Sequence, residues 1–358
     1  MKGLLFDTLP LDLLINKSKY YLNKKFEYYL NIMPENIRKT FKGTTFSSIE
    51  LKSKKLEIKD LPISWYCLNV LQSLSVEKPR EDRIHFIKNV FQQTDLGGNV
   101  IDFLTYDFSS NEFRYKIPIN LNKKLNLNFG TISTLETIQE YEKWEIEFIK
   151  ALEIVRSINP TLTQDLNLLV KNILVIKSSE DSHNSMSPKS LVGTIYLPDI
   201  KDSTLIAECF IHECLHQYLY RIEFAGSLFN NNDGIDELYY SPWKDEPRPL
   251  IMVLHGAFVF TGVLLYYFEL YKKKLPKKHL IKFKDRMVFR NGQVRIALKV
   301  LLHSKKNTDL GKKIIETLED KLLEINNSNV FAGDNEIDTV LDHFNKFCSK
   351  NFKHVSIK

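Results

Sequence analysis

The stretch of residues 249–274, PLIMVLHGAFVFTGVLLYYFELYKKK, constrains the fold more than any other part of this 358-residue chain. A helix that is apolar on every side is either buried in a large core or spans a membrane, and a span needs about 20 apolar residues. This run reaches that length only by including one histidine, one threonine and two glycines. We therefore expect a buried core helix and no membrane span.

The composition supports a globular chain with a sizeable core, since 43% of its residues are hydrophobic. Lys and Arg number 50 against 44 Asp and Glu, a formal charge of +6, and the positive residues form short clusters at 52–55 and 272–278. Such clusters are typical of a solvated surface. The chain has no zinc-finger spacing and no aromatic-rich RNA-binding motif. We expect no nucleic-acid partner.

The cysteines and the start of the chain indicate a reducing compartment. The four cysteines do not form the pattern of a disulfide framework. The first residues, MKGLLFDTLPLDLL, are interrupted by Asp7 and Asp12, and no small-residue cleavage site follows them. We therefore expect a cytoplasmic protein.

The pattern of apolar residues predicts a mainly α (α+β) fold, a helical core with a small β element before one of its helices. A polar, Asn-rich texture near residues 100–130 divides an N-terminal helical region, 1–125, from a larger domain, 126–358. Expected strands lie at 172–179 and 191–198, and a long loop follows residue 225. The expected helices lie at 18–33, 62–74, 80–93, 133–158, 203–221, 249–274, 278–304, 308–325 and 335–350.

The expected helix at 203–221 contains AECFIHECLHQYLYR, in which His212 and His216 stand four residues apart and Glu213 follows the first. Positions i and i+4 lie one turn apart on the same helical face, so the two imidazoles are placed to bind one metal ion. H-E-x-x-H is a known metal-binding signature in which the glutamate acts on a metal-bound water. The helix therefore predicts a metal site.

A catalytic metal needs a third protein ligand. The peptidase pattern H-E-x-x-H-x-x-G-x-x-H is excluded because Leu219 and Ile222 stand at its last two positions. A second peptidase pattern uses a later glutamate, for which the candidates are Glu237 and Glu246. The other candidate is His255 in the apolar helix, where a buried imidazole needs a partner and a metal is one.

The runs GTIYLP (193–198), HECLH (212–216), SPW (241–243), RPL (248–250) and HGAFVF (255–260) together resemble the HExxH-type peptide-modifying proteins found beside ribosomally made precursor peptides. The similarity extends over about residues 135–325. Members of that family are regarded as iron(II)- and 2-oxoglutarate-dependent peptide β-hydroxylases, with O₂ as co-substrate. The resemblance implies that His212 and His216 bind iron, that His255 is the third ligand, and that the substrate is a precursor peptide with leader and core. Iron oxygenases normally use two histidines and one carboxylate, so Glu213 or an acid at 236–246 stays open as the third ligand instead of His255.

Further residues are candidates for the same site. Arg248 and Arg290 are expected to grip the distal carboxylate of 2-oxoglutarate, a contact that arginine makes in bidentate geometry. Trp243 is expected to line the substrate site, and Glu213 either anchors a bound group or acts as a base. The target carbon is an unactivated β-carbon, for which an Asp side chain fits the positive charge of the chain.

Other readings of the sequence stay open. The main alternative is a zinc metallopeptidase in which a downstream glutamate is the third ligand and Glu213 activates water. A third reading is a scaffold that only recognises the precursor. The region 1–125 is the expected docking place for a leader peptide, and a homodimer is compatible with the chain, which leaves the oligomeric state open.

Overall fold

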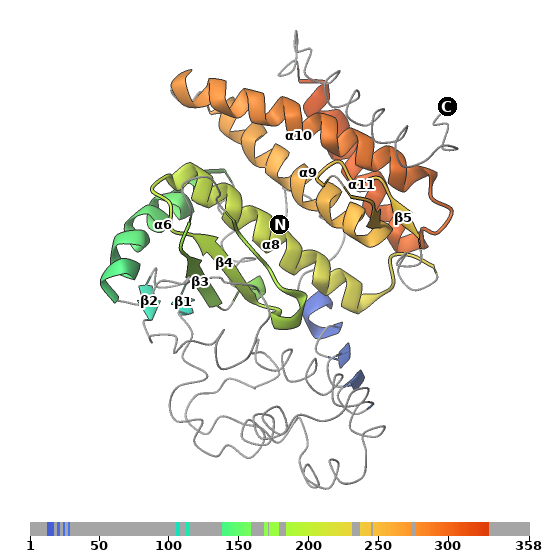
Figure 1. Cartoon of the computed structure of the whole chain (residues 1–358), viewed down its shortest axis with the longest axis horizontal. Helices are drawn as coiled ribbons and strands as arrows, with labels where there is room; N and C mark the ends of the chain where they lie inside the picture. Colours follow the sequence, from blue (N-terminus) through green and yellow to red (C-terminus); the bar gives the residue numbers. More distant parts are fainter. Residues whose placement is uncertain are drawn as a thin grey trace, which may run out of the picture. The chain divides into compact units, whose positions relative to one another are not determined.

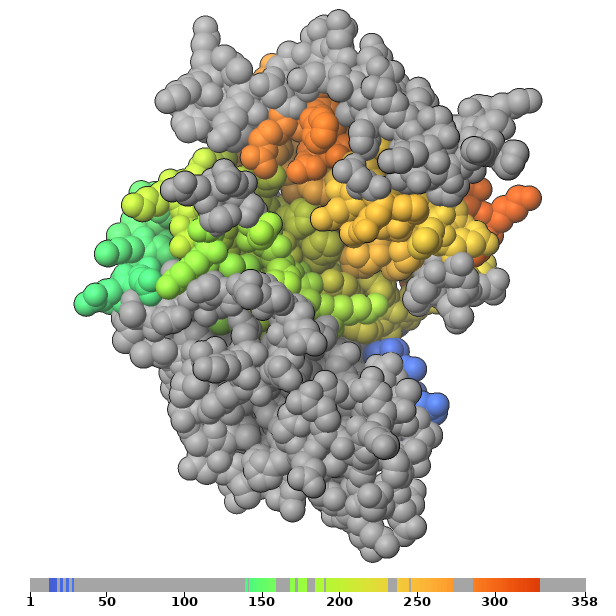
Figure 2. Space-filling model, viewed as in Figure 1, coloured from blue at the N-terminus to red at the C-terminus, as the bar shows by residue number. Residues whose placement is uncertain are grey.

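The computed structural model describes most of the chain from residue 138 to residue 328. The described segments are 13–17, 20–21, 24–25, 28, 105–107, 112–114, 138–158, 168–170, 172–178, 184–230, 237–244, 246–273 and 277–328. Figure 1 shows these residues in colour, and Figure 2 colours those whose side chains are described. The predicted helices at 62–74, 80–93 and 335–350 and the predicted boundary near residue 125 lie outside them, as do most residues of the predicted helix at 18–33.

The chain divides into two compact units. The first, called the α8 unit here, comprises Pro10–Val155 and Thr163–Ala225. The second, called the α9 unit, comprises Met1–Leu9, Arg156–Leu162 and Gly226–Lys358.

The α8 unit combines small sheets with two long helices. Its strands and helices are β1 (Thr105–Asp107), β2 (Glu112–Arg114), α6 (Ile138–Ile158, whose last three residues fall in the other unit), β3 (Asn172–Ile176), the 3₁₀ turn η4 (Lys189–Leu191), β4 (Thr194–Pro198) and α8 (Ser203–Ala225). β3 and β4 pair in parallel, and β1 and β2 pair antiparallel. The indole of Trp144 on α6 donates to the carbonyl of Pro198 at 2.9 Å, which ties that helix to the end of β4. α8 packs against β4 (Figure 1).

A short segment ahead of β4 extends its pairing. Met186 and Tyr196 exchange both main-chain hydrogen bonds, at 3.0 and 2.8 Å, in an antiparallel bridge. β4 therefore has β3 as a parallel neighbour and the segment around Met186 as an antiparallel one. The same segment places two serines against α8.

The α9 unit is built around the apolar helix. Its elements are β5 (Leu238–Tyr239), β6 (Arg248–Pro249), α9 (Leu250–Lys272), α10 (Lys277–His303) and α11 (Asp309–Asn326). β5 and β6 pair antiparallel ahead of α9, and α9, α10 and α11 pack on one another (Figure 1). Helix makes up 71% of the described core, with small two-stranded sheets before the helices, which confirms the predicted mainly α fold class.

The helix α9 is long and apolar enough to cross a membrane, with a mean hydropathy of 1.9 over its most apolar window. In the described structure 83% of that window is buried. Length and hydropathy do not separate a core helix from a membrane span, since both pass the same test. The burial of α9 agrees with the expected core helix. The expectation that α9 does not span a membrane stays a prediction.

Candidate metal centre

The helix α8 exposes its two motif histidines along a single stripe. Two main-chain N–H groups of its first turn, those of Thr204 and Leu205, donate to the carboxylate of Asp202 at 3.1 Å, which caps the helix. From residue 206 to residue 222 every side chain is buried apart from three partly exposed ones: His212, His216 and Tyr220. Their spacing of four places them on one face. The open side of α8 is therefore the histidine side.

The two imidazoles are close enough to act together. The ring centroids of His212 and His216 are 4.9 Å apart, and the ring planes are inclined at 70°. The ring of Tyr220 follows along the stripe, with its centroid 6.2 Å from that of His216. The sequence prediction that His212 and His216 share one helical face is confirmed.

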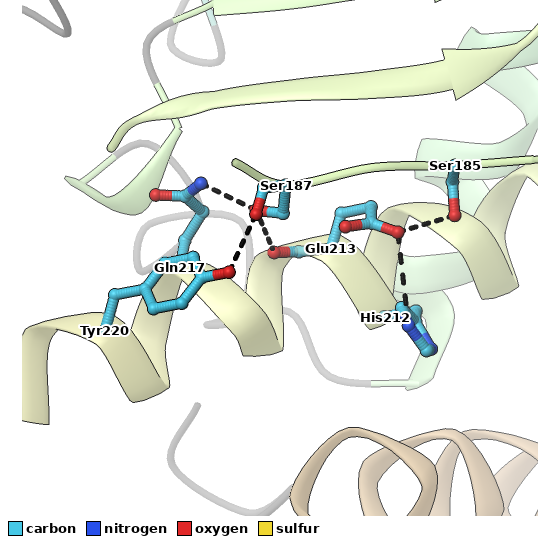
Figure 3. Close-up of polar contacts among 6 residues, drawn as sticks. All are labelled: Ser185, Ser187, His212, Glu213, Gln217 and Tyr220. Atoms are coloured by element: carbon cyan, nitrogen blue, oxygen red, sulfur yellow. Dashed lines mark hydrogen bonds and ion pairs between the residues drawn. The ribbon is translucent and has the colours of Figure 1, made fainter. Parts of the chain in front are cut away.

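Glu213, between the histidines in sequence, is buried with 2% of its surface exposed. The hydroxyl of Ser185 donates to its Oε1 at 2.6 Å, and the same oxygen is 4.0 Å from Nε2 of His212 (Figure 3). Burial raises the pKa of Glu213 to about 8, although the Ser185 hydrogen bond acts in the opposite direction. Its other oxygen, Oε2, has no hydrogen-bond partner among the described residues.

The turn of α8 after Glu213 is fixed to β4 by a buried amide. The side chain of Gln217 accepts from the main-chain N–H of Gly193 at 2.6 Å and donates to Ser187 Oγ at 2.6 Å and to the carbonyl of Thr194 at 3.1 Å. Gly193 has a positive φ of 93°, which glycine adopts without strain. The Tyr220 hydroxyl donates to the main-chain carbonyl of Ser187 at 2.8 Å (Figure 3).

Two imidazole nitrogens suit zinc or iron(II), and both metals need at least one further protein ligand at a catalytic site. Among the described residues, no group of three or more His, Cys, Asp or Glu side chains is arranged to hold a metal ion. The buried Oε2 of Glu213, which lacks a donor in the described part of the chain, fits a site that takes up a ligand or an ordered water. His212 and His216 therefore fit two positions of a metal site.

The predicted third ligand, His255, belongs to the other unit. It lies in the second turn of α9 with 5% of its surface exposed. The burial that the sequence predicted for this imidazole is therefore present. Its role as a ligand stays a prediction.

Trp243 is held against α9 beside that histidine. A Cβ added at Gly256 would lie 2.4 Å from Cε3 of Trp243, so the indole occupies the space that only glycine leaves open. The indole also stacks on Phe260 at 5.5 Å between ring centroids. Its Nε1 is buried without a hydrogen-bond partner in the described structure. Whether it contacts a substrate stays a prediction.

The two predicted cofactor arginines have different surroundings. The guanidinium of Arg290 on α10 lies 4.2 Å from the ring centroid of Phe260 and donates to Gln293 at 2.8 Å. Gln293 in turn donates to the carbonyl of Pro242 at 2.6 Å, next to Trp243 in the chain. Arg248 instead donates to Glu246 at 2.7 Å. Arg248 therefore already has an acidic partner, which a carboxylate of 2-oxoglutarate would have to replace. That Arg248 or Arg290 binds this carboxylate stays a prediction.

The two candidate carboxylate ligands of the peptidase reading are engaged elsewhere. Glu237 is 60% exposed in its side chain, pairs with Lys306 at 3.0 Å and accepts from the Tyr239 hydroxyl at 2.6 Å. Glu246 is 68% exposed and carries the Arg248 ion pair. The only acidic residue of α9, Glu269, pairs with Lys272 in the last turn.

Sequence reasoning did not identify Ser185 or Gln217. Ser185 lies in a polar segment that the pattern interprets as a loop, 28 residues before Glu213. Gln217 directly follows the motif, and its position there was the one available signal.

Comparison with known proteins assigns no family to the chain. No protein-family model matches it, and no curated protein matches it.

Proposed function

We propose that this protein is an iron(II)- and 2-oxoglutarate-dependent oxygenase that hydroxylates an unactivated β-carbon in a ribosomally made precursor peptide. The observation that carries the metal-dependent part is the stripe on α8, where the two histidines and Tyr220 stay partly exposed on a helix otherwise buried from residue 206 to residue 222. The oxidative part is supported by the family resemblance of the motifs.

The chain supplies the proposed metal-binding groups as imidazole side chains. His212 and His216 bind iron(II) through one face of α8, and His255 stays the predicted third ligand. Iron(II) with three protein ligands keeps open positions for 2-oxoglutarate and O₂, which together supply the oxidising chemistry for a C–H bond. The protein side chains bind and orient these groups and exclude water from around them.

Glu213 is proposed to orient a bound group by accepting its hydrogen bond. Its Oε1 lies 4.0 Å from Nε2 of His212. Ser185 already donates to that oxygen, which fixes its direction. In a hydrolase the same carboxylate would have to remove a proton from water.

Of the two predicted cofactor arginines, Arg290 is the one held by an aromatic ring and an amide, whereas Arg248 is paired with a carboxylate. The guanidinium of Arg290 rests on the face of Phe260, which holds the planar fork in one orientation. Gln293 fixes it further. We propose that Arg290 binds the distal carboxylate of 2-oxoglutarate. Arg248, paired with Glu246, is the second candidate.

A zinc metallopeptidase is the second candidate function because H-E-x-x-H serves both chemistries. That reading needs a downstream glutamate as third ligand. Glu237 and Glu246 are exposed and paired with cations, and α9 has no acidic residue before Glu269. Both candidate carboxylates therefore have other partners in the described structure, which counts against each as a third ligand of zinc and equally of iron(II).

The experiment that separates the two functions starts from metal-free protein loaded with either Fe(II) or Zn(II) without oxygen. A precursor peptide encoded beside the gene is added with and without 2-oxoglutarate, the sample is exposed to O₂, and the peptide is weighed by mass spectrometry. We expect one added oxygen atom only with Fe(II) and 2-oxoglutarate together. A cleaved peptide formed with Zn(II) and without 2-oxoglutarate would establish the peptidase instead.

A matched pair of histidine variants tests the metal stripe in the same assay. His216→Ala removes one proposed ligand and is expected to lose both bound iron and hydroxylation. His303→Ala removes an exposed histidine of α10. In the described part of the chain, its ring hydrogen-bonds to a main-chain carbonyl. This variant is expected to keep both. Equal iron content in the two variants would move the metal away from α8.

A further inference from the structure

The segment ahead of β4 lies along α8 and presents two serines to it. Met186 pairs with Tyr196 on β4, and its neighbours Ser185 and Ser187 both contact α8 (Figure 3). Successive side chains of an extended segment point to opposite sides, so residues two apart share a side. The two serines are therefore equivalent in direction and differ in what they contact.

The contacts of the two serines separate a main-chain role from a side-chain role. Ser187 Oγ donates to the main-chain carbonyl of Glu213 at 3.3 Å and accepts from Gln217. Ser185 Oγ donates to the carboxyl oxygen Oε1 of Glu213 at 2.6 Å. Among the described residues, Ser185 is the one that hydrogen-bonds to this carboxyl group, since Oε2 has no partner there. Ser187 therefore holds the helix, and Ser185 holds the carboxyl group.

A buried carboxyl group with one hydrogen bond depends strongly on that bond. Glu213 is 2% exposed, so replacing a lost hydrogen-bond donor by water would be costly. A carboxylate oxygen is also a good ligand for iron(II) and zinc. Oε1 lies 4.0 Å from Nε2 of His212, so a metal ion bound at His212 would lie close to a carboxylate released from the Ser185 hydroxyl.

We propose that Ser185 is a positioning residue that keeps Glu213 beside the metal as a hydrogen-bond acceptor and prevents its carboxylate from becoming a metal ligand. The inference deepens the proposed function and rests on its metal-binding part alone, because it concerns how many protein groups touch the metal. The segment ahead of β4 would thereby keep one coordination position of the metal open. The proposed oxygenase needs such positions for 2-oxoglutarate and O₂.

The test uses Co(II) as the metal, because its visible absorption responds to the number and kind of its ligands. The full chain is freed of metal, loaded with one equivalent of Co(II), and compared as wild type, Ser185→Ala and Ser185→Thr. Ser185→Ala is expected to shift the cobalt spectrum, because the released carboxylate binds the ion. Ser185→Thr keeps the hydroxyl and is expected to return the wild-type spectrum.

Two further variants identify the cause of the shift. Ser187→Ala changes the neighbouring serine, which contacts only the main chain of Glu213, and is expected to leave the spectrum unchanged. In the double variant Ser185→Ala/Glu213→Gln no carboxylate is available, so the shift is expected to disappear. A Ser185→Ala spectrum identical to wild type, or a shift that persists in the double variant, would overturn the inference.

The outcome is separable from that of the proposed function. A wild-type protein that binds no Co(II) would overturn the metal site and the inference together. A wild-type protein that binds Co(II) and hydroxylates nothing would overturn the oxygenase proposal, while the five spectra would still decide the role of Ser185.

Discussion

Gln217 shows how a single side chain connects α8 to β4. It is completely buried, and its amide satisfies three polar groups, on Gly193, Thr194 and Ser187. Gln217→Leu keeps the volume and leaves all three groups without this partner. Because buried polar groups without partners cost about 1–3 kcal/mol each, we expect the free energy of unfolding to fall by roughly 3 kcal/mol or more. Urea unfolding measures this loss.

A surface variant calibrates the Gln217 measurement. Glu147→Gln removes an exposed ion pair with Lys150 at 2.6 Å, which we expect to change the free energy of unfolding by less than about 1 kcal/mol. A Gln217→Leu variant no less stable than Glu147→Gln would show that the buried amide is not what joins α8 to β4.

The helix α8 begins with a side-chain cap. Asp202 accepts hydrogen bonds from the N–H groups of Thr204 and Leu205. Asp202→Ala removes this acceptor, and we expect a loss of about 1 kcal/mol in the free energy of unfolding. Asp202→Asn keeps a capping oxygen and should retain most of the stability in the same thermal or urea titration. An equal loss in both variants would argue against capping as the cause.

The helix α9 depends on the close approach of Trp243 to Gly256. Alanine in place of glycine inside a helix normally stabilises by roughly 0.5–1 kcal/mol. Here the new Cβ would lie 2.4 Å from the indole, so we expect Gly256→Ala to destabilise the fold by about 1–3 kcal/mol. Chemical unfolding monitored by circular dichroism gives the value.

The cause of that loss is tested in a second background. Once Trp243→Leu has removed the indole, Gly256→Ala no longer meets an aromatic ring, and the substitution is expected to become neutral or stabilising. The same destabilisation in both backgrounds would place the conflict elsewhere on α9.

At the scale of the whole molecule, the helical architecture follows from the sequence because its periodicity is strong. The expected helices at 133–158, 203–221, 249–274, 278–304 and 308–325 correspond to α6, α8, α9, α10 and α11. The two expected strands correspond to β3 and β4, although each is shorter than predicted. Alternating or continuous apolar runs determine such elements locally, and sequence patterns report local structure well.

Contacts between distant residues were not predictable in the same way. The bridge between Met186 and Tyr196 is one pair long and lies in a segment rich in serine, so it leaves no periodic signal. The Ser185 contact with Glu213 arises only because that bridge aligns the segment with α8. The pairing of β5 with β6 is two residues long and falls in the long predicted loop. The candidate site can therefore be predicted as a motif on a helix. The groups that orient its side chains can be identified only from the folded structure.

The central claim is that the metal at His212 and His216 supports oxidation of a peptide by O₂. Its most direct test follows the origin of the added oxygen. Wild-type protein with Fe(II), 2-oxoglutarate and the precursor peptide is exposed to ¹⁸O₂ in ordinary water, and the peptide is analysed by tandem mass spectrometry. We predict one heavy oxygen on a single side chain, absent in His216→Ala. A peptide that gains only ordinary oxygen, or that is cleaved and not hydroxylated, would contradict the claim.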